Sequence, residues 1–101
     1  MIKAVCMFRL ADGIDEEEFE KFFKKHVEDA KKLKNLKQYT IAKRVDKDDK
    51  ENFFRVNELY YNSAKDAEES FSTDHAKEAT EELLGWVKDF NCVIVSEEIV
   101  L

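Results

Sequence analysis

Residues 2–27, IKAVCMFRLADGIDEEEFEKFFKKHV, contain a strand signal followed closely by a helix signal. Apolar side chains at every second position predict a strand over residues 2–10: Ile2, Ala4, Cys6, Phe8 and Leu10. Asp12-Gly13 is a turn signal. Asp15 is the expected helix N-cap, with Glu18 three residues later as its capping-box partner. Together these signals predict a strand–turn–helix unit at the start of the chain.

The helix is expected to continue to about Leu33, and Asn35 is a plausible stop. Its apolar stripe has the 3.6-residue period of an amphipathic helix and consists of Phe19, Phe22, Phe23, His26, Val27, Ala30 and Leu33. Lysine and glutamate residues fill the opposite side. This pattern predicts a helix with one aromatic face packed on a sheet.

The remaining sequence also contains strand signals and helix signals in turn. We expect strands over residues 36–45 and 53–61, joined by a polar loop over residues 46–52. A helix in two pieces follows, with Ser63 as the first cap and a restart at Thr73, and the last strand covers residues 90–95. The order strand, helix, strand, strand, helix, strand predicts a ferredoxin-like α+β fold. One domain over residues 1–101 would then carry helices on one face of a four-stranded antiparallel sheet.

Composition excludes several classes of function. The chain has 101 residues, with 17 Lys and Arg against 23 Asp and Glu, so its net charge of −6 gives no attraction to nucleic acid. No stretch approaches the ~20 apolar residues of a membrane span, and the N-terminus lacks a signal-peptide pattern. Cys6 and Cys92 fit no metal or redox spacing. We therefore expect a cytoplasmic protein with reduced cysteines and without a metal or cofactor.

The strands carry apolar residues on both faces, although helices cover only one face of such a sheet. In the first strand, Val5 and Met7 lie on the face opposite Ala4, Cys6 and Phe8. In the third strand, one face has Phe54, Val56 and Tyr60, and the other has Phe53, Leu59 and Tyr61. In the last strand, Val93 and Val95 lie opposite Cys92 and Ile94. A second apolar face in a domain of this size predicts another layer. The expected layer is a second copy of the chain, giving a homodimer through the open sheet face. The alternative is a monomer with a partly apolar face.

Several segments resemble EthD-like proteins of the dimeric α+β barrel group. They are Asp15-Glu16-Glu17-Glu18-Phe19 with Phe22, Phe23 and His26, then Leu33-Lys34-Asn35-Leu36-Lys37-Gln38-Tyr39, and Glu82-Leu83-Leu84-Gly85-Trp86-Val87. The resemblance covers nearly the whole chain. It implies a barrel shared by two sheets, and a role of the kind this family has in ether degradation or in polyketide-type ring oxidation or cyclisation. It also places the family's helical histidine at His26.

His26 is the main candidate for catalysis. Its place in the apolar stripe predicts a desolvated imidazole with a lowered pKa, which can act as a general base. The alternative is a packed histidine hydrogen-bonded to a strand. Candidates for binding an apolar ligand are the aromatic residues Phe22, Phe23, Tyr39, Tyr60 and Trp86, each with core packing as its alternative. Tyr60 and Tyr61 point to opposite faces, so only one of them can line a given cavity.

Other polar residues leave alternatives open. Arg55 and Asn57 share one face of the third strand and are either a ligand anchor or part of an interface salt bridge. His75 is expected to be exposed. With two histidines and no H-x-x-x-H spacing, a zinc site is not expected. Some dimeric α+β barrels degrade haem with an Asn, a Trp and a His; the first strand here has Cys6 and no Asn, so a haem site is not expected either.

The sequence therefore predicts a dimer that binds an apolar, aromatic small molecule between helix and sheet. His26 would support cofactor-independent oxygenation, cyclisation or isomerisation. The alternatives are a non-catalytic binding protein and a structural dimer. A cavity of a few hundred Å³ beside His26 would favour the first two, whereas a cleft filled by Phe8, Phe22, Phe23 and Tyr39 would favour the third.

Overall fold

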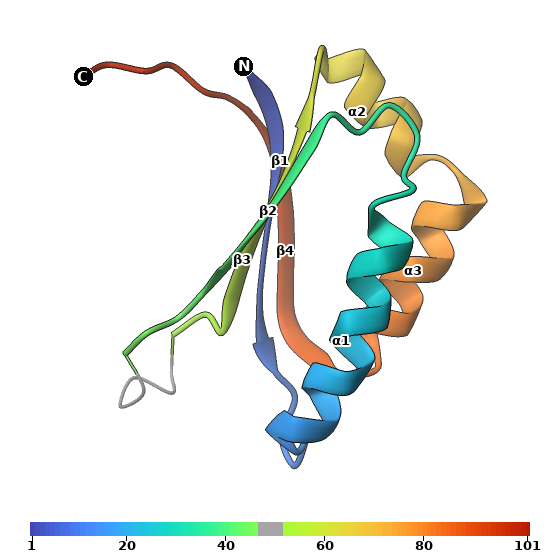
Figure 1. The fold of residues 1–101 in the computed structure, drawn as a ribbon, viewed down its shortest axis with the longest axis vertical. Helices are drawn as coiled ribbons and strands as arrows, with labels where there is room; N and C mark the ends of the chain where they lie inside the picture. Colours follow the sequence, from blue (N-terminus) through green and yellow to red (C-terminus); the bar gives the residue numbers. More distant parts are fainter. Residues whose placement is uncertain (47–51) are drawn as a thin grey trace.

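The computed structural model describes residues 1–46 and 52–101. The elements follow the order β1 (Ile2–Leu10), α1 (Glu16–Ala30), β2 (Gln38–Lys43), β3 (Arg55–Tyr61), α2 (Ala64–Phe71), α3 (Asp74–Leu84) and β4 (Val87–Ser96). The strands form one antiparallel sheet in the order β2-β3-β1-β4. All three helices lie on one face of the sheet (Figure 1). The predicted ferredoxin-like α+β fold is confirmed. The predicted loop over residues 46–52 lies mostly outside the described residues.

The predicted helix starts are confirmed by their caps. The Asp15 carboxylate accepts a hydrogen bond from the backbone N–H of Glu18 at 3.2 Å. The hydroxyls of Ser63 and Thr73 accept in the same way at the starts of α2 and α3, each at 3.1 Å. The end of α1 differs from the prediction, because the helix stops at Ala30 and the chain turns before Asn35, which has a φ of 67°. Asparagine tolerates this left-handed conformation.

The core forms where the helices cover β1 and β3. One cluster contains Phe8, Phe19, Phe23, Phe54, Leu83 and Val87, and a second contains Ala4, Cys6, Leu59, Tyr61 and Ala67. The rings of Phe19 and Phe23 stack with centroids 5.2 Å apart. Phe54, which the alternation grouped with Val56 and Tyr60, does not share their face and is buried on the helix side. It precedes β3, so the alternation of that strand does not apply to it, and its ring contacts Phe19 edge-on at 5.7 Å.

A bulge in β4 sets which of its residues face the helices. Arg9 pairs with Lys88 and Met7 pairs with Asn91, so two residues of β4, Asp89 and Phe90, lie opposite a single residue of β1. Asp89 has a φ of 54°, a conformation that aspartate adopts more readily than most residues. The extra residue shifts the alternation by one position. Val87 and Cys92 are therefore both directed to the helix side.

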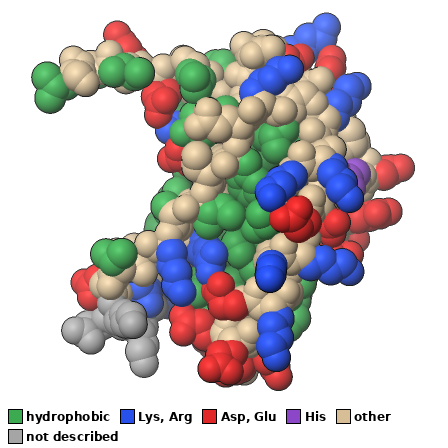
Figure 2. Space-filling view, viewed as in Figure 1, with side chains coloured by type: hydrophobic (Ala, Val, Ile, Leu, Met, Phe, Trp, Pro, Cys, Tyr) green, Lys and Arg blue, Asp and Glu red, His purple; other side chains and the backbone are tan. Residues whose placement is uncertain are grey.

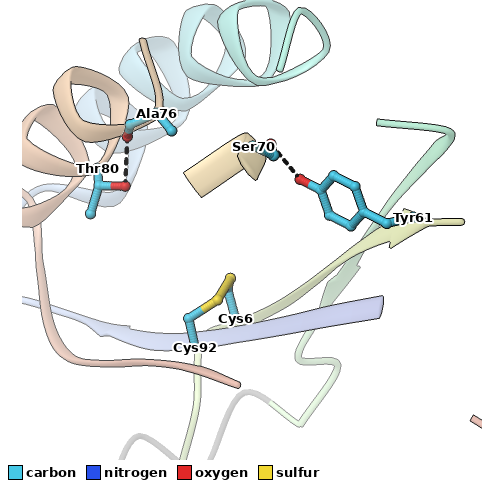
Figure 3. The surroundings of a disulfide bond; sticks show 6 residues. All are labelled: Cys6, Tyr61, Ser70, Ala76, Thr80 and Cys92. Atoms are coloured by element: carbon cyan, nitrogen blue, oxygen red, sulfur yellow. Dashed lines mark hydrogen bonds between the residues drawn. A yellow bond between two sulfur atoms is a disulfide. The ribbon is translucent and has the colours of Figure 1, made fainter. Parts of the chain in front are cut away.

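The register pairs Cys6 with Cys92, and their sulfur atoms form a disulfide (Figure 3). The prediction of reduced cysteines is wrong for this structure. Spacing along the chain was a poor guide, because antiparallel β1 and β4 place the two residues opposite each other with Cα atoms 4.1 Å apart. Cys6 is buried and Cys92 is exposed.

The other face of the sheet is free of helices. Apolar residues of three strands lie on it: Val5, Met7, Val56, Val93 and Val95. A polar group borders them, in which the Lys3 ammonium lies 3.1 Å from Glu58 and 2.5 Å from Glu97. Figure 2 shows a hollow on this side, bordered by the C-terminal segment and by the hairpin end of the sheet. Within the described residues, no helix has the length and apolar character needed to cross a membrane.

Candidate functional site

A cavity lies between the helices and the middle of the sheet. Its walls come from the end of α1, from α3 and from all four strands, and they include His26, Ala30, Tyr39, Asn57, Ala76, Ala79, Thr80, Leu83 and Phe90. We call this space the inner chamber; its volume is about 60 Å³. Alanine at positions 30, 76 and 79 leaves the space open, because a larger side chain at any of these wall positions would extend into it. The chamber is predominantly apolar.

A wider space adjoins the inner chamber, and we call it the outer chamber. It has a volume of about 470 Å³ and is lined by residues of α3 and β4, including Lys77, Glu81, Cys92 and Ile94. Five residues line both spaces: Cys6, Phe71, Ala76, Thr80 and Phe90. The two chambers therefore adjoin each other, and we call them together the cleft: the outer chamber lies along the edge strand β4 and the inner chamber lies at His26. The disulfide lies on its sheet side, below Ala76 and Thr80 of α3 (Figure 3).

His26 lies at the narrow end of the cleft. Its ring packs against Phe22 and Phe23, with centroid separations of 5.7 and 5.6 Å, and the residue is 8% exposed. Burial lowers the pKa of its imidazole, although the charges of Asp29 and Glu82 partly oppose this effect. Its Nδ1 atom has no hydrogen-bond partner among the described residues. The imidazole is therefore mainly neutral at pH 7, and its Nδ1 atom is a buried nitrogen without a hydrogen-bond partner among the described residues.

Tyr39 and Asn57 join His26 in the wall of the inner chamber. Burial raises the pKa of Tyr39 to about 12, so its hydroxyl keeps its proton at neutral pH and can donate a hydrogen bond. Asn57 lies on β3, 4% exposed, and its Oδ1 atom has no partner among the described residues. The sequence associated Tyr39 with the His26 cleft and considered Asn57 as a ligand anchor. The structure brings both residues together with His26.

The other predicted binding residues do not line either chamber. Phe22 and Trp86 stack on each other with centroids 5.0 Å apart, and Phe23 belongs to the core cluster. Tyr60 is on the opposite face of the sheet, where its hydroxyl donates to Glu58 at 2.7 Å. Phe22 and Phe23 still hold the ring of His26 in place. The sequence missed the alanines, because small residues in an amphipathic stripe give no sign of the space they leave.

Arg55 and His75 make contacts within the chain. The Arg55 guanidinium is paired with Glu20 of α1 and lies over the Phe23 ring, 4.5 Å from its centroid. His75 is half-buried and its Nε2 lies 2.8 Å from the carbonyl oxygen of Asp29, so the prediction of an exposed histidine is wrong. Among the described residues, no cluster of three or more His, Cys, Asp or Glu could hold a metal ion.

Comparison with solved structures identifies the fold. The chain superposes on an EthD family protein from Bacillus halodurans with a TM-score of 0.82 and 18% identity, over 97% of this chain and 99% of that one. It superposes on the protein At3g17210 from Arabidopsis thaliana with a TM-score of 0.83 and 17% identity, over 100% and 99%. The EthD-like resemblance predicted from the sequence is confirmed for the fold. No family model and no curated protein sequence matches the chain.

Proteins with the same fold include enzymes and dimers. SnoaB from Streptomyces nogalater, a cofactor-independent oxygenase, superposes with a TM-score of 0.76 and 15% identity, over 99% of this chain and 95% of that one. A dimeric protein with a ferredoxin-like fold from Bacteroides fragilis superposes with a TM-score of 0.75 and 14% identity, over 95% of both chains.

Proposed function

We propose that this protein is an EthD-like homodimer that binds an apolar, aromatic small molecule in the cleft and uses His26 as a general base. The observation that carries the proposal is a neutral, buried imidazole with a free nitrogen at the end of an apolar cleft. The inner chamber beside His26 has about 60 Å³, and the adjoining outer chamber, which His26 does not line, has the several hundred Å³ typical of ligand sites. The existence of a cofactor-independent oxygenase with this fold supports chemistry that needs no metal.

The proposed chemistry begins with a proton transfer. A ligand C–H group next to a carbonyl group would give its proton to the unprotonated ring nitrogen of His26, forming an imidazolium and an enolate. The protonated hydroxyl of Tyr39 would donate a hydrogen bond to the enolate oxygen. Ring closure, isomerisation or reaction with molecular oxygen could then follow from the enolate.

The alternative is a non-catalytic binding protein or a structural dimer. The observation that favours it is the small volume of the inner chamber, about 60 Å³, which leaves little room for a reacting group beside His26. Of the four residues expected to fill such a cleft, Tyr39 lines the inner chamber, whereas Phe8, Phe22 and Phe23 pack in the core cluster or against it.

A cavity-filling variant tests the proposal. Ala79→Leu adds a larger apolar side chain to the inner chamber. We expect it to abolish the binding of 1-naphthol, measured by isothermal titration calorimetry, while the protein stays folded by circular dichroism. Ala64→Leu is the matched control at an exposed residue of α2 that lines neither chamber, and it should retain binding. Unchanged affinity of Ala79→Leu, or no binding by the wild-type protein, would contradict the proposal.

The predicted homodimer and cytoplasmic location also belong to this proposal. The apolar open face and the existence of a dimeric protein with this fold support the dimer. The disulfide counts against the cytoplasmic location, because disulfides persist mainly in oxidising compartments. In the cytoplasm, Cys6 and Cys92 would be reduced to thiols.

A further inference from the structure

Two buried polar atoms in the wall of the inner chamber lack partners among the described residues: Nδ1 of His26 and Oδ1 of Asn57. Their residues come from different elements, α1 and β3, and both are more than nine-tenths buried. Three other polar side chains near the cleft, those of Thr80, Tyr61 and Ser70, are satisfied within the chain. Thr80 donates to the carbonyl oxygen of Ala76 at 2.9 Å, and the Tyr61 and Ser70 hydroxyls lie 2.8 Å apart (Figure 3). Buried polar atoms are normally paired, so the two exceptions point to a ligand.

The chemistry of the two atoms restricts the ligand. An amide oxygen can only accept a hydrogen bond, so the ligand must offer a donor to Asn57. The neutral imidazole either donates or accepts at Nδ1, depending on its tautomer. A hydroxyl group serves both atoms when Nδ1 carries the imidazole proton, because it then donates to Oδ1 of Asn57 and accepts from Nδ1–H of His26. A ketone or ether oxygen would leave Asn57 unpaired, with the cost of a buried, unsatisfied group.

Charge restricts the ligand further. The described residues that line the inner chamber include no Asp, Glu, Lys or Arg, so a carboxylate or an ammonium group would have no counter-charge there. The inner chamber, at about 60 Å³, exceeds the roughly 10–15 Å³ that one water molecule needs, so it can take a hydroxyl and part of a ring. The outer chamber can take the remaining apolar part of the molecule.

We propose that the cleft selects neutral aromatic alcohols, of the phenol or naphthol class, and that Asn57 determines this specificity. The hydroxyl lies between Oδ1 of Asn57 and Nδ1 of His26. The inference rests on the proposed function, since it assigns the polar end of the ligand that the cleft would bind. In this arrangement the hydroxyl-bearing edge of the ligand ring lies at His26, and the opposite edge points toward β4.

The test compares 1-naphthol with 1-methylnaphthalene on the full chain by isothermal titration calorimetry. These two probes have similar size and differ in one hydrogen-bonding group. We expect 1-naphthol to bind the wild-type protein about tenfold more tightly, a difference that two buried hydrogen bonds can supply. Asn57→Leu should remove this preference while keeping affinity for 1-methylnaphthalene. Asn91→Leu, the same change on the other face of the sheet, should keep the preference.

The outcomes separate this inference from the proposed function. Equal affinities of the wild-type protein for the two probes would overturn the inference and leave an apolar cleft. A preference that survives in Asn57→Leu would also overturn the role of Asn57. Binding of neither probe would overturn both the inference and the proposed function. If Asn57→Leu fails to fold, His26→Phe provides the second variant, and a preference that survives in it would contradict the two-atom site.

Discussion

At the residue scale, the central feature is a histidine that is buried among aromatic rings. The Phe22 and Phe23 rings hold His26 by packing, and no carboxylate pairs with its free nitrogen among the described residues. The cost of burying a charged imidazole therefore falls on the protonated form, which lowers the pKa below its ordinary value of 6.5. A base that is neutral at pH 7 is ready to accept a proton.

The lowered pKa of His26 predicts how stability depends on pH. The unfolded chain takes up a proton near pH 6.5, whereas the folded protein does so only at lower pH. The free energy of unfolding should therefore fall as the pH drops below about 6.5, until the folded imidazole also becomes protonated. Urea unfolding between pH 7.5 and pH 4.5 measures this effect. His26→Gln should weaken the dependence and His75→Gln should not, and identical pH profiles for all three proteins would contradict the prediction.

At the element scale, α3 and β4 form the walls of the outer chamber, and each is positioned by a local feature. The cap at Thr73 starts α3 in a new direction after α2, and the bulge at Asp89 directs Phe90 and Cys92 to the helix side. The disulfide then links β4 to β1 at the base of the cleft. Small local features thus set the shape of the cleft.

The cap of α3 gives a prediction for stability. Thr73→Ala removes the oxygen that accepts from the backbone N–H of Ala76 at 3.1 Å, so the free energy of unfolding should fall by about 1 kcal/mol. Thr73→Ser keeps the hydroxyl, so its free energy of unfolding should fall much less. Urea unfolding of both variants measures the difference. Equal losses in the two variants would show that the methyl group matters rather than the cap.

The disulfide gives a second prediction at this scale. Cys6 and Cys92 are 86 positions apart, and closing so long a loop stabilises a protein by roughly 4–5 kcal/mol in the chain-entropy model. A reductant should lower the free energy of unfolding of the wild-type protein by an amount of this order. The free energy of unfolding of Cys92→Ser should be as low as that of the reduced wild-type protein, both with and without reductant. Rapid labelling of Cys92 by iodoacetamide in the protein purified under oxidising conditions would contradict the disulfide.

The elements show what sequence reasoning could reach. Alternation and caps predicted the strands, the helix starts at Asp15, Ser63 and Thr73, and the fold, because these signals are local. The disulfide and the helix-side burial of Phe54 depend on strand register, which residue spacing does not encode. The site was predicted in part. His26 and Tyr39 line the cleft, whereas Phe22, Phe23, Trp86 and Tyr60 pack elsewhere, because aromatic character is equally suited to a core.

At the scale of the whole molecule, the sheet separates two sides of the protein that differ in character. The helix side holds the core and the cleft, and the open side carries Val5, Met7 and their apolar neighbours around a group of paired charges. The hydrogen bonds that the Lys3 ammonium donates to Glu97 and Glu58 raise the pKa of Lys3, so this group stays charged at any physiological pH. An apolar centre with a charged border is typical of an interface between proteins.

This arrangement predicts the oligomeric state. The wild-type protein should sediment at about twice the chain mass of 11.9 kDa in analytical ultracentrifugation. Val5→Glu introduces a charge at the centre of the open face and should shift the protein to the monomer. Leu84→Glu is the matched control, because Leu84 is exposed on the helix side at 48%. A wild-type monomer, or a dimer that tolerates Val5→Glu, would contradict an interface on this face.

The account depends most on His26 being at the end of a ligand-binding cleft. Long-range ¹H–¹⁵N NMR of the imidazole rings during a titration with 1-naphthol tests this most directly, because the chain has only two histidines. The account predicts that the ring nitrogen signals of His26 shift and saturate, while those of His75, which is bonded to the Asp29 carbonyl, stay unchanged. Unchanged His26 signals at saturating 1-naphthol would contradict it.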